Sequence, residues 1–481
     1  MSKATKHDVI VMGAGPAGYS AAIRSAQLGA AVLLVEKGGV GGTCLNRGCI
    51  PTKFLWEAVS LGKKMKHAAE FGLDGDFAGY NMPLMLQRKA RTTEMLGKSL
   101  RKLLESHSVA LLEGTAKFIS RTTIEIGAGG GSLLTAHAPK IIIATGSIPK
   151  NIPGLIFDHT RIIDSTDALN LTEAPRRLLI VGGGAIGVEF ATLYANLGSE
   201  VMLVEREHQL LPGEDAELAR EVEKLLQRLG VKVTTCAGSL ESLVPQYDKI
   251  IVVAGRQPAL DNLALDKAAV AYSSCGVTVN DYLETTTAGI FAAGDAAGRS
   301  FMAYTAQAEG IVAAENAMGN QQKAPDCGAV PRVVFSQPPA ASVGVKESDV
   351  TGDTVTIGRS PLASSSRAFG ETERTGVTGD TITIGRFPLA ANSRAFIEGE
   401  RTGWVKLLAD KNSGRIIGGQ IIGPHAEDLI AVVSLAIRCR LTLGDLRREL
   451  FFHPSLSESI HAAGETAGGT CVELPPPKRT L

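Results

Sequence analysis

The sequence has little of what would mark a nucleic-acid-binding, membrane-bound or disulfide-scaffolded protein. Its 49 Lys and Arg balance 49 Asp and Glu, and this zero net charge argues against a nucleic-acid or polybasic membrane surface. No apolar run approaches the ~20 residues that span a bilayer, and the start has no signal-peptide core. The seven cysteines are mostly scattered, which suits a reducing compartment. We therefore expect a soluble, cytoplasmic protein with no nucleic-acid or membrane partner.

The overall composition is typical of a globular protein. Of the 481 residues, 44% are hydrophobic and 20% are charged. A chain of this length can bury a sizeable core and is expected to form two to four domains.

Two cysteines five positions apart, Cys44 and Cys49, lie in the glycine-rich stretch 41–53. No histidine pair or second cysteine pair follows them, so we predict no metal site. The spacing suits a reversible disulfide, because five residues of helix exceed one turn. Lys53 adds a cation that favours a nearby thiolate. The alternative is two buried cysteines that never pair.

A dinucleotide-binding pattern precedes this stretch. A buried-type strand at 8–12 is followed by Gly13, Gly15 and Gly18, a helical run, a second strand and Glu36. Gly13 allows a tight turn, Gly15 the close approach of a pyrophosphate, and Gly18 tight helix packing. With both strands and the acid in place, the motif is a strong signal for a bound dinucleotide.

The same pattern recurs downstream. The strand 178–181 leads into Gly182, Gly184 and Gly187, and a second strand ends at Glu205. Both acids lie 23 residues after the first glycine of their pattern, so the chain is expected to bind two dinucleotides.

Glu205 bears on the choice of nicotinamide cofactor. A carboxylate there accepts a hydrogen bond from a free 2′-hydroxyl and repels a 2′-phosphate, which favours NAD over NADP. Arg206 is the counter-argument, because a cation nearby tolerates the phosphate.

The remaining sequence predicts further elements of both kinds. Helix is expected over 53–106 with a break near 72–83, and over 426–439; strands are expected over 109–126, 140–144, 405–408 and 415–422.

Over nearly its whole length the chain resembles the flavin-dependent pyridine nucleotide–disulfide oxidoreductases, most specifically in the redox stretch 41–53. The resemblance implies an α/β fold with two Rossmann-like dinucleotide-binding domains and a C-terminal α+β interface or dimerisation domain. The expected domains are 1–150 (FAD, with the redox disulfide), 151–275 (NAD), 276–330 (completing the FAD domain) and 331–481 (interface).

The resemblance also assigns site residues. The FAD site would comprise Gly13, Gly15, Gly18, Glu36, Gly42, Thr43, Lys53, Thr145, Gly146 and Asp295. The NAD site would comprise Gly182, Gly184, Gly187 and Glu205, and Gly255 and Arg256 would be further cofactor-binding residues.

The implied catalytic residues are Cys44, Cys49, Lys53, Glu189, His453 and Glu458. Glu189 would pair with Lys53, and the His453–Glu458 pair would serve the disulfide of a dimer partner. Imidazole suits thiols that lose and regain protons near neutral pH. Without the family, Glu189 would be a solvated helix carboxylate and His453 a loop histidine.

The implied activity is oxidation of protein-bound dihydrolipoyl groups through the disulfide and FAD, with reduction of NAD⁺ to NADH. The implied partners are a second copy of the chain and the lipoyl-bearing subunits of 2-oxoacid dehydrogenase or glycine-cleavage complexes. One alternative is an NAD(P)H-dependent disulfide reductase of the glutathione or mercuric reductase type. Glu205 argues against the first type, and Cys471, alone near the C-terminus, against the second. The other alternative is a catalytically impaired flavoprotein subunit of a complex.

Three features depart from the family pattern. Residues 350–376 recur at 377–403 with 21 of 27 positions identical, and we expect the second copy, with Phe387 and Ile397, to form the native strand while the first is extruded or pairs irregularly. The NAD domain lacks a strand hairpin between Cys236 and Lys249. Tyr304 stands where the family has histidine, with no consequence that we can assign.

Overall fold

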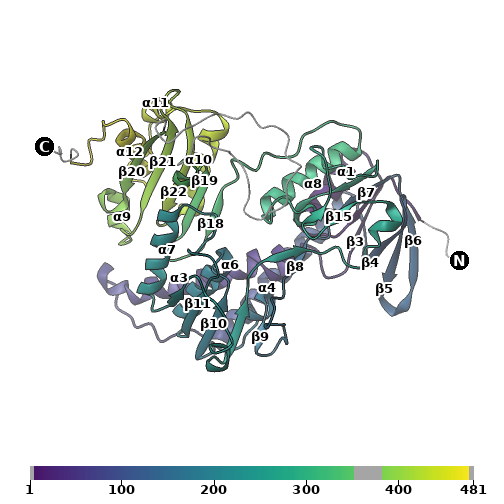
Figure 1. The fold of residues 1–481 in the computed structure, drawn as a ribbon, viewed down its shortest axis with the longest axis horizontal. Coiled ribbons are helices and arrows are strands. Elements are labelled where there is room, and N and C mark those ends of the chain that lie inside the picture. The colour runs from purple at the N-terminus through teal and green to yellow at the C-terminus, as the bar shows by residue number, and fades with distance from the viewer. Residues whose placement is uncertain (1–4, 351–381, 476–481) are drawn as a thin grey trace. The chain divides into compact units, whose positions relative to one another are not determined.

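The computed structural model describes residues 5–350 and 382–475, drawn as ribbons in Figure 1. The described chain forms two compact units. The first contains residues 5–175 and 249–325, and the second contains 176–248, 326–350 and 382–475.

An eight-stranded sheet forms the centre of the first unit. Its order is β1 (Thr5–Lys6), β6 (Leu133–His137), β5 (Thr123–Ala128), β4 (Ala110–Ser120), β3 (Val32–Glu36), β2 (Val9–Met12), β7 (Lys140–Ile143) and β17 (Ile290–Ala292). The run from β4 to β17 is parallel, whereas β4, β5 and β6 are antiparallel. Strands β2 and β3 are buried along their whole length, as expected for a sheet covered on both faces.

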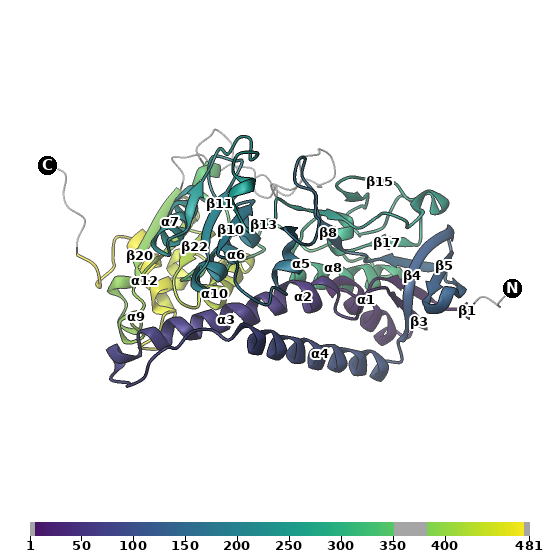
Figure 2. The same cartoon turned by 90° about the horizontal axis from the view of Figure 1, so that it is seen from below.

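Helices cover this sheet. Helix α1 (Pro16–Gln27) lies beside α8 (Ala303–Ala317). Helices α2 (Gly42–Arg47), α3 (Cys49–Lys66) and α4 (Met82–Ser106) follow β3, and Figure 2 shows α3 and α4 side by side. The predicted helix over 53–106 and its break are confirmed, with η1 (Ala68–Phe71) ending just before Gly72.

Short elements complete the first unit. They are η2 (Gly129–Gly131), the pair β8 (Ser147–Pro149) and β14 (Arg256–Pro258), the pair β9 (Ile162–Ile163) and β13 (Lys249–Val252), α5 (Ser165–Ala168), η4 (Leu265–Ala268), the pair β15 (Tyr272–Ser273) and β16 (Gly276–Val277), and η5 (Gly294–Ala297).

The second unit begins with a second parallel arrangement. Strand β11 (Glu200–Val204) lies between β10 (Arg177–Val181) and β12 (Lys232–Thr234), and helices α6 (Ala185–Asn196) and α7 (Ala216–Arg228) connect them. Between Cys236 and Asp248 the chain forms η3 (Val244–Gln246) and no strand. The shortening of this part relative to the family stays a prediction.

An antiparallel sheet follows in the second unit. Its order is β18 (Arg332–Val334), β19 (Ala340–Gly344), β22 (Ile416–Ile422), β21 (Trp404–Asp410) and β20 (Ile382–Pro388). The helices of this part are η6 (Glu347–Val350), η8 (Leu389–Ala391), α9 (Ser393–Ile397), α10 (Ala426–Arg438), α11 (Leu443–Arg448) and α12 (Glu458–Ala467). Two parallel-strand units and this α+β sheet confirm the predicted fold class.

The second copy of the repeat forms β20, which pairs with β21, and its Phe387 is fully buried. That part of the prediction is confirmed, although Ile397 is exposed at the end of α9. The predicted extrusion of the first copy concerns residues that, beyond Val350, lie outside the described ranges. In the described chain, no helix is both long and apolar enough to cross a membrane.

Candidate functional site

The first glycine loop packs so closely that Gly13 and Gly18 have no room for a side chain. Gly13 has φ +101°, and a Cβ on Gly18 would lie 1.7 Å from the Gly13 carbonyl oxygen. The Ala14 N–H donates to Glu36 Oε2 at 2.6 Å, and the Gly38 N–H donates to Oε1 at 2.6 Å. Each carboxylate oxygen keeps a second lone pair for a ribose hydroxyl.

The redox stretch lies directly against this loop. The Gly41 N–H donates to the Ala14 carbonyl at 2.8 Å, and a Cβ on Gly42 would lie 2.6 Å from Gly15 Cα. Gly42 also has φ +57°, a conformation that favours glycine. The thiol-bearing helix therefore starts beside the place where the loop would receive a pyrophosphate.

Cys44 and Cys49 lie on two helices rather than one. Helix α2 ends at Arg47 and α3 begins at Cys49, with Gly48 between them at φ −144° and ψ −108°. The side chain of Cys44 is partly buried and that of Cys49 is exposed. The backbone adjustment expected from the sequence is thus a break in the helix at Gly48.

The two thiols act on each other. A hydrogen bond between them, burial and the charge of a Cys49 thiolate together raise the pKa of Cys44, and Lys53 opposes this rise. Burial raises the pKa of Tyr19 on α1, and the charges of Cys44 and Cys49 add to that rise. Gln307 of α8 hydrogen-bonds the Tyr19 hydroxyl. Lys53 is thus close enough to favour a thiolate at Cys44.

Asp295 lies half-buried in η5 and is held by Ser147, which is itself held by Arg256. The Ser147 hydroxyl donates to Asp295 Oδ2, and Arg256 donates to Ser147 through Nε to the hydroxyl and Nη2 to the carbonyl, both at 2.8 Å. Burial raises the pKa of Asp295, and Ser147 and Arg256 counteract it. Burial also lowers the pKa of Arg256.

These residues fit a flavin nucleotide. The buried Thr145 hydroxyl finds no hydrogen-bond partner within the described chain, and its neighbour Gly146 has φ +72° with open space on its Cβ side. An unsatisfied buried hydroxyl costs free energy unless a ligand completes it. Together with the side-chain-free cradle of Gly13, Gly15 and Gly18, it supports the predicted FAD site.

The second glycine loop repeats the first. Gly182 has φ +112°, and a Cβ on Gly187 would lie 1.8 Å from the Gly182 carbonyl oxygen. The Gly183 N–H donates to Glu205 Oε2 at 2.6 Å, and the Glu207 N–H donates to Oε1 at 2.9 Å. The predicted nucleotide geometry is present, and a Cβ on Gly184 would meet open space.

The Arg206 guanidinium is already paired with a carboxylate and is therefore not available to a 2′-phosphate. Its guanidinium donates to Glu207 Oε1 from Nη2 at 2.8 Å and from Nε at 3.2 Å. The pair is exposed, so it is weak, but it offsets the charge that argued for NADP.

Glu189 is buried on α6, so the reading of it as a solvated helix carboxylate is wrong. The Phe335 N–H donates to its Oε1 at 3.2 Å within the second unit. Its pairing with Lys53, which belongs to the first unit, stays a prediction.

His453 and Glu458 meet as predicted. His453 Nδ1 lies 2.9 Å from Glu458 Oε1, and the Ser455 N–H donates to the other carboxylate oxygen at 2.7 Å. Glu458 is the first residue of α12, and the imidazole is 70% exposed. A carboxylate held at Nδ1 leaves Nε2 for proton exchange with another molecule.

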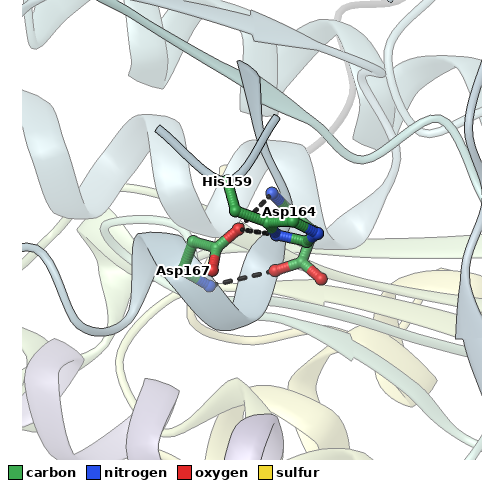
Figure 3. Close-up of side chains that lie close together, drawn as sticks. All are labelled: His159, Asp164 and Asp167. Carbon is green, nitrogen blue, oxygen red and sulfur yellow. Dashed lines mark hydrogen bonds and ion pairs between the residues drawn. The ribbon is translucent and has the colours of Figure 1, made fainter. Parts of the chain in front are cut away.

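A separate cluster of His159, Asp164 and Asp167 has the composition of a metal site. In Figure 3, His159 Nδ1 points at the Asp167 carboxylate, at 2.8 Å, and Asp164 accepts from the Asp167 N–H at 2.9 Å. The two aspartates form a capping box at the start of α5. Helix capping accounts for this arrangement.

Several residues around the site were not predicted. Two contacts join residues far apart in the sequence, Ser147 with Asp295 and Tyr19 with Gln307. Two others are nearer, Glu309 with Gly294 and with Arg299. For Glu309 the sequence held a signal, a charged residue among small ones in 303–314. The others carry no local pattern.

Comparison with known families agrees with this geometry. Residues 7–310 match the family model described as pyridine nucleotide-disulphide oxidoreductase, and residues 370–463 match the dimerisation domain of the same family.

Individual relatives cover almost the whole chain. A dihydrolipoyl dehydrogenase of Geobacillus stearothermophilus is 35% identical over 491 residues, covering 98% of both chains. Dihydrolipoyl dehydrogenase 2 of Haloarcula marismortui is 36% identical over 97% of this chain and 98% of its own.

Two solved structures have the same fold. LpdA from Mycobacterium tuberculosis superposes with a TM-score of 0.82 at 25% identity, covering 96% of this chain and 99% of its own. RclA from Escherichia coli, an HOCl-induced flavoprotein disulfide reductase, gives a TM-score of 0.78 at 27% identity with the same coverage.

Proposed function

The chain belongs to the pyridine nucleotide-disulphide oxidoreductase family, and we propose that it catalyses the dihydrolipoyl dehydrogenase reaction, oxidising dihydrolipoyl groups and reducing NAD⁺. The observation that carries the proposal is the place where helix α2, which bears Cys44, begins. Its first residue, Gly42, packs against Gly15 of the first dinucleotide loop. FAD, when bound, supplies electron transfer between the dithiol and NAD. The residues that would hold it are the Gly13–Gly18 loop, Glu36, Thr145 and Asp295.

The chain's own residues account for the thiol chemistry. His453 accepts a proton from the substrate dithiol, and Glu458 stabilises the resulting imidazolium. The substrate thiolate attacks Cys44 of the oxidised Cys44–Cys49 pair, which forms a mixed disulfide and releases Cys49 as a thiolate. The second substrate thiol then displaces Cys44, so the substrate leaves as a disulfide and the enzyme holds two reduced sulfurs. Lys53 stabilises the thiolate charge.

The remaining assignments belong to the same proposal. NAD rather than NADP would bind at Gly182, Gly184, Gly187 and Glu205, since Glu207 offsets Arg206. The match to a dimerisation domain supports a homodimer in which His453 serves the partner's dithiol. We propose lipoyl-bearing complex subunits as substrates, a cytoplasmic location consistent with the scattered cysteines of the sequence, and the domain boundaries 1–150, 151–275, 276–330 and 331–481.

The direct test is NAD⁺ reduction by dihydrolipoamide, with NADP⁺ in a parallel cuvette. Cys49→Ser should lower turnover more than ~10³-fold and keep FAD, whereas Cys439→Ser, which alters another exposed thiol, should change neither. Preserved turnover in Cys49→Ser would refute the mechanism. Bound FAD without wild-type turnover would favour an impaired flavoprotein subunit.

The likeness to RclA favours a second candidate, disulfide reduction driven by a nicotinamide nucleotide. The two candidates differ in direction and substrate. Rapid NADH oxidation by small disulfides, with slow dihydrolipoamide oxidation, would favour the reductase.

A further inference from the structure

A buried carboxylate lies behind the Gly294–Asp295 turn of the first unit. Glu309, on α8, has none of its surface exposed. Its Oε2 accepts the Gly294 N–H at 2.8 Å, and its Oε1 accepts Arg299 Nε at 3.1 Å. Gly294 directly precedes Asp295, the residue proposed to bind FAD.

Keeping a carboxylate at this position is costly. Burial raises the pKa of Glu309 to about 7, and the nearby Asp295 adds to the rise, although Arg299 and the Gly294 N–H favour the ionised form. An apolar side chain would avoid this cost but would leave the Gly294 N–H and Arg299 without their acceptor.

We propose that Glu309 is a positioning residue for the flavin. The Glu309 carboxylate holds the Gly294–Asp295 turn in the position from which Asp295 binds FAD. The inference rests on the proposed FAD site and adds a residue that does not itself touch the cofactor.

Tight packing fixes where this carboxylate lies. A Cβ on Gly310 would lie 2.1 Å from the Ala17 carbonyl oxygen, so α8 meets the backbone of α1 directly. Gly294, at φ +67°, would place a Cβ 3.0 Å from Ala306 of α8 and 3.1 Å from Ala17. Helix α8, helix α1 and the turn thus meet at one point, and Glu309 supplies the polar link there.

The turn is also held from its other side. Ser147 donates to Asp295 and is itself held by Arg256. Asp295 therefore lies between a fixed donor and a turn whose N–H is held by Glu309. A change in either contact should alter how firmly Asp295 holds a ligand.

The test measures release of FAD from the purified holoprotein, followed by the recovery of free-flavin fluorescence. Glu309→Ala should release FAD at least ~10-fold faster, the effect of one lost buried hydrogen bond to a held group. Glu309→Gln keeps an acceptor oxygen and should restore part of the hold. Glu315→Gln is the matched control, because Glu315 is a buried carboxylate of the same helix paired with Arg24.

The outcomes separate this inference from the proposed FAD site. Wild-type protein that binds no FAD would refute the site itself. Wild-type protein that binds FAD, with Glu309→Ala releasing it at the wild-type rate, would refute the positioning role alone. Equal acceleration in Glu309→Ala and Glu315→Gln would show a general loss of helix stability and would also overturn the role. If Glu309→Ala does not fold, Glu309→Asp, which shortens the reach to Gly294, takes its place with the same expectations.

Discussion

The two glycine loops, residues 9–38 and 178–207, have the same backbone but different surroundings. In each, the first glycine N–H donates to the end of the neighbouring strand, and a glutamate accepts two backbone N–H groups. The first loop, however, is covered by its own chain, since a Cβ on Gly15 would already contact Gly42. Gly184, its counterpart, faces open space. We propose that the first loop holds a resident cofactor and the second holds one that exchanges.

The two loops also differ in what holds them. Close contact between small residues fixes the first, where Gly310 of α8 meets Ala17 of α1. Charged groups fix the segment that follows the second. Lys406 of β21 is fully buried and donates to Asp215, Glu217 and Glu347 at 3.0 to 3.2 Å. Nearby, Arg332 and Ser342 both bind Glu214.

The largest expected effect comes from breaking that charged cluster. Lys406→Met should lower the free energy of unfolding of the second unit by about 3–5 kcal/mol, because it leaves Asp215 buried without its counter-ion. FAD should stay bound, since the cluster lies wholly in the second unit. The chain has two tryptophans, so urea unfolding followed by Trp404 fluorescence in a Trp56→Phe background reports on the second unit.

Lys411→Met, at an exposed lysine just after β21, is the control and should change the free energy of unfolding by less than ~0.5 kcal/mol.

Acid should weaken the cluster around Lys406. Burial alone would raise the pKa of the Asp215 carboxyl, but Lys406 and backbone N–H donors lower that pKa below 3.8. Its stabilisation is therefore present above pH 3.8 and lost as the pH falls through the folded value, and Lys406→Met should lack this acid-sensitive step. Release of FAD when the second unit unfolds would contradict the expectation that the Lys406 cluster stabilises the second unit alone.

The sequence predicted the parts of this comparison that are local. Gly13 to Glu36 and Gly182 to Glu205 have fixed spacings that a strand–turn–helix requires. The contact between His453 and Glu458, five residues apart, was predicted from the resemblance to the family.

The contacts that hold these motifs were not predictable in the same way. Ser147 reaches Asp295 across 148 positions, and Lys406 reaches Asp215 across 191. Single polar residues at such separations form no pattern, and their partners are set by how helices and sheets pack. In the same way Phe335 donates its N–H to Glu189 across 146 positions.

A smaller, matched pair of changes tests the roles of the two loops directly. Gly18→Ala and Gly187→Ala would each place a methyl group within 2 Å of a carbonyl oxygen, at 1.7 and 1.8 Å. Overpacking of this kind costs ~1–3 kcal/mol. Gly18→Ala should weaken FAD retention about 5- to 150-fold, whereas Gly187→Ala should keep FAD and raise the KM for NAD⁺ by a similar factor.

Gly97→Ala is the control for both, because Gly97 lies in α4 with open space around its Cβ position. It should leave FAD and NAD⁺ binding unchanged and stabilise α4 slightly. If Gly187→Ala also released FAD, the resident and exchangeable roles would not be divided between the loops as proposed.

The smallest effect is expected at one of the positions at which the side chains of the two loops differ. Two residues after the acid, the first loop has Gly38 and the second has Glu207, and both N–H groups bind their acid. Glu207→Gln should free Arg206 to meet a 2′-phosphate and raise kcat/KM for NADP⁺ about two- to fivefold, since exposed ion pairs are weak. Activity with NAD⁺ should hold, because Glu205 is untouched, and the exposed Glu241→Gln should change neither value. An unchanged NADP⁺ value in Glu207→Gln would assign cofactor choice to Glu205 alone and remove Glu207 from the comparison.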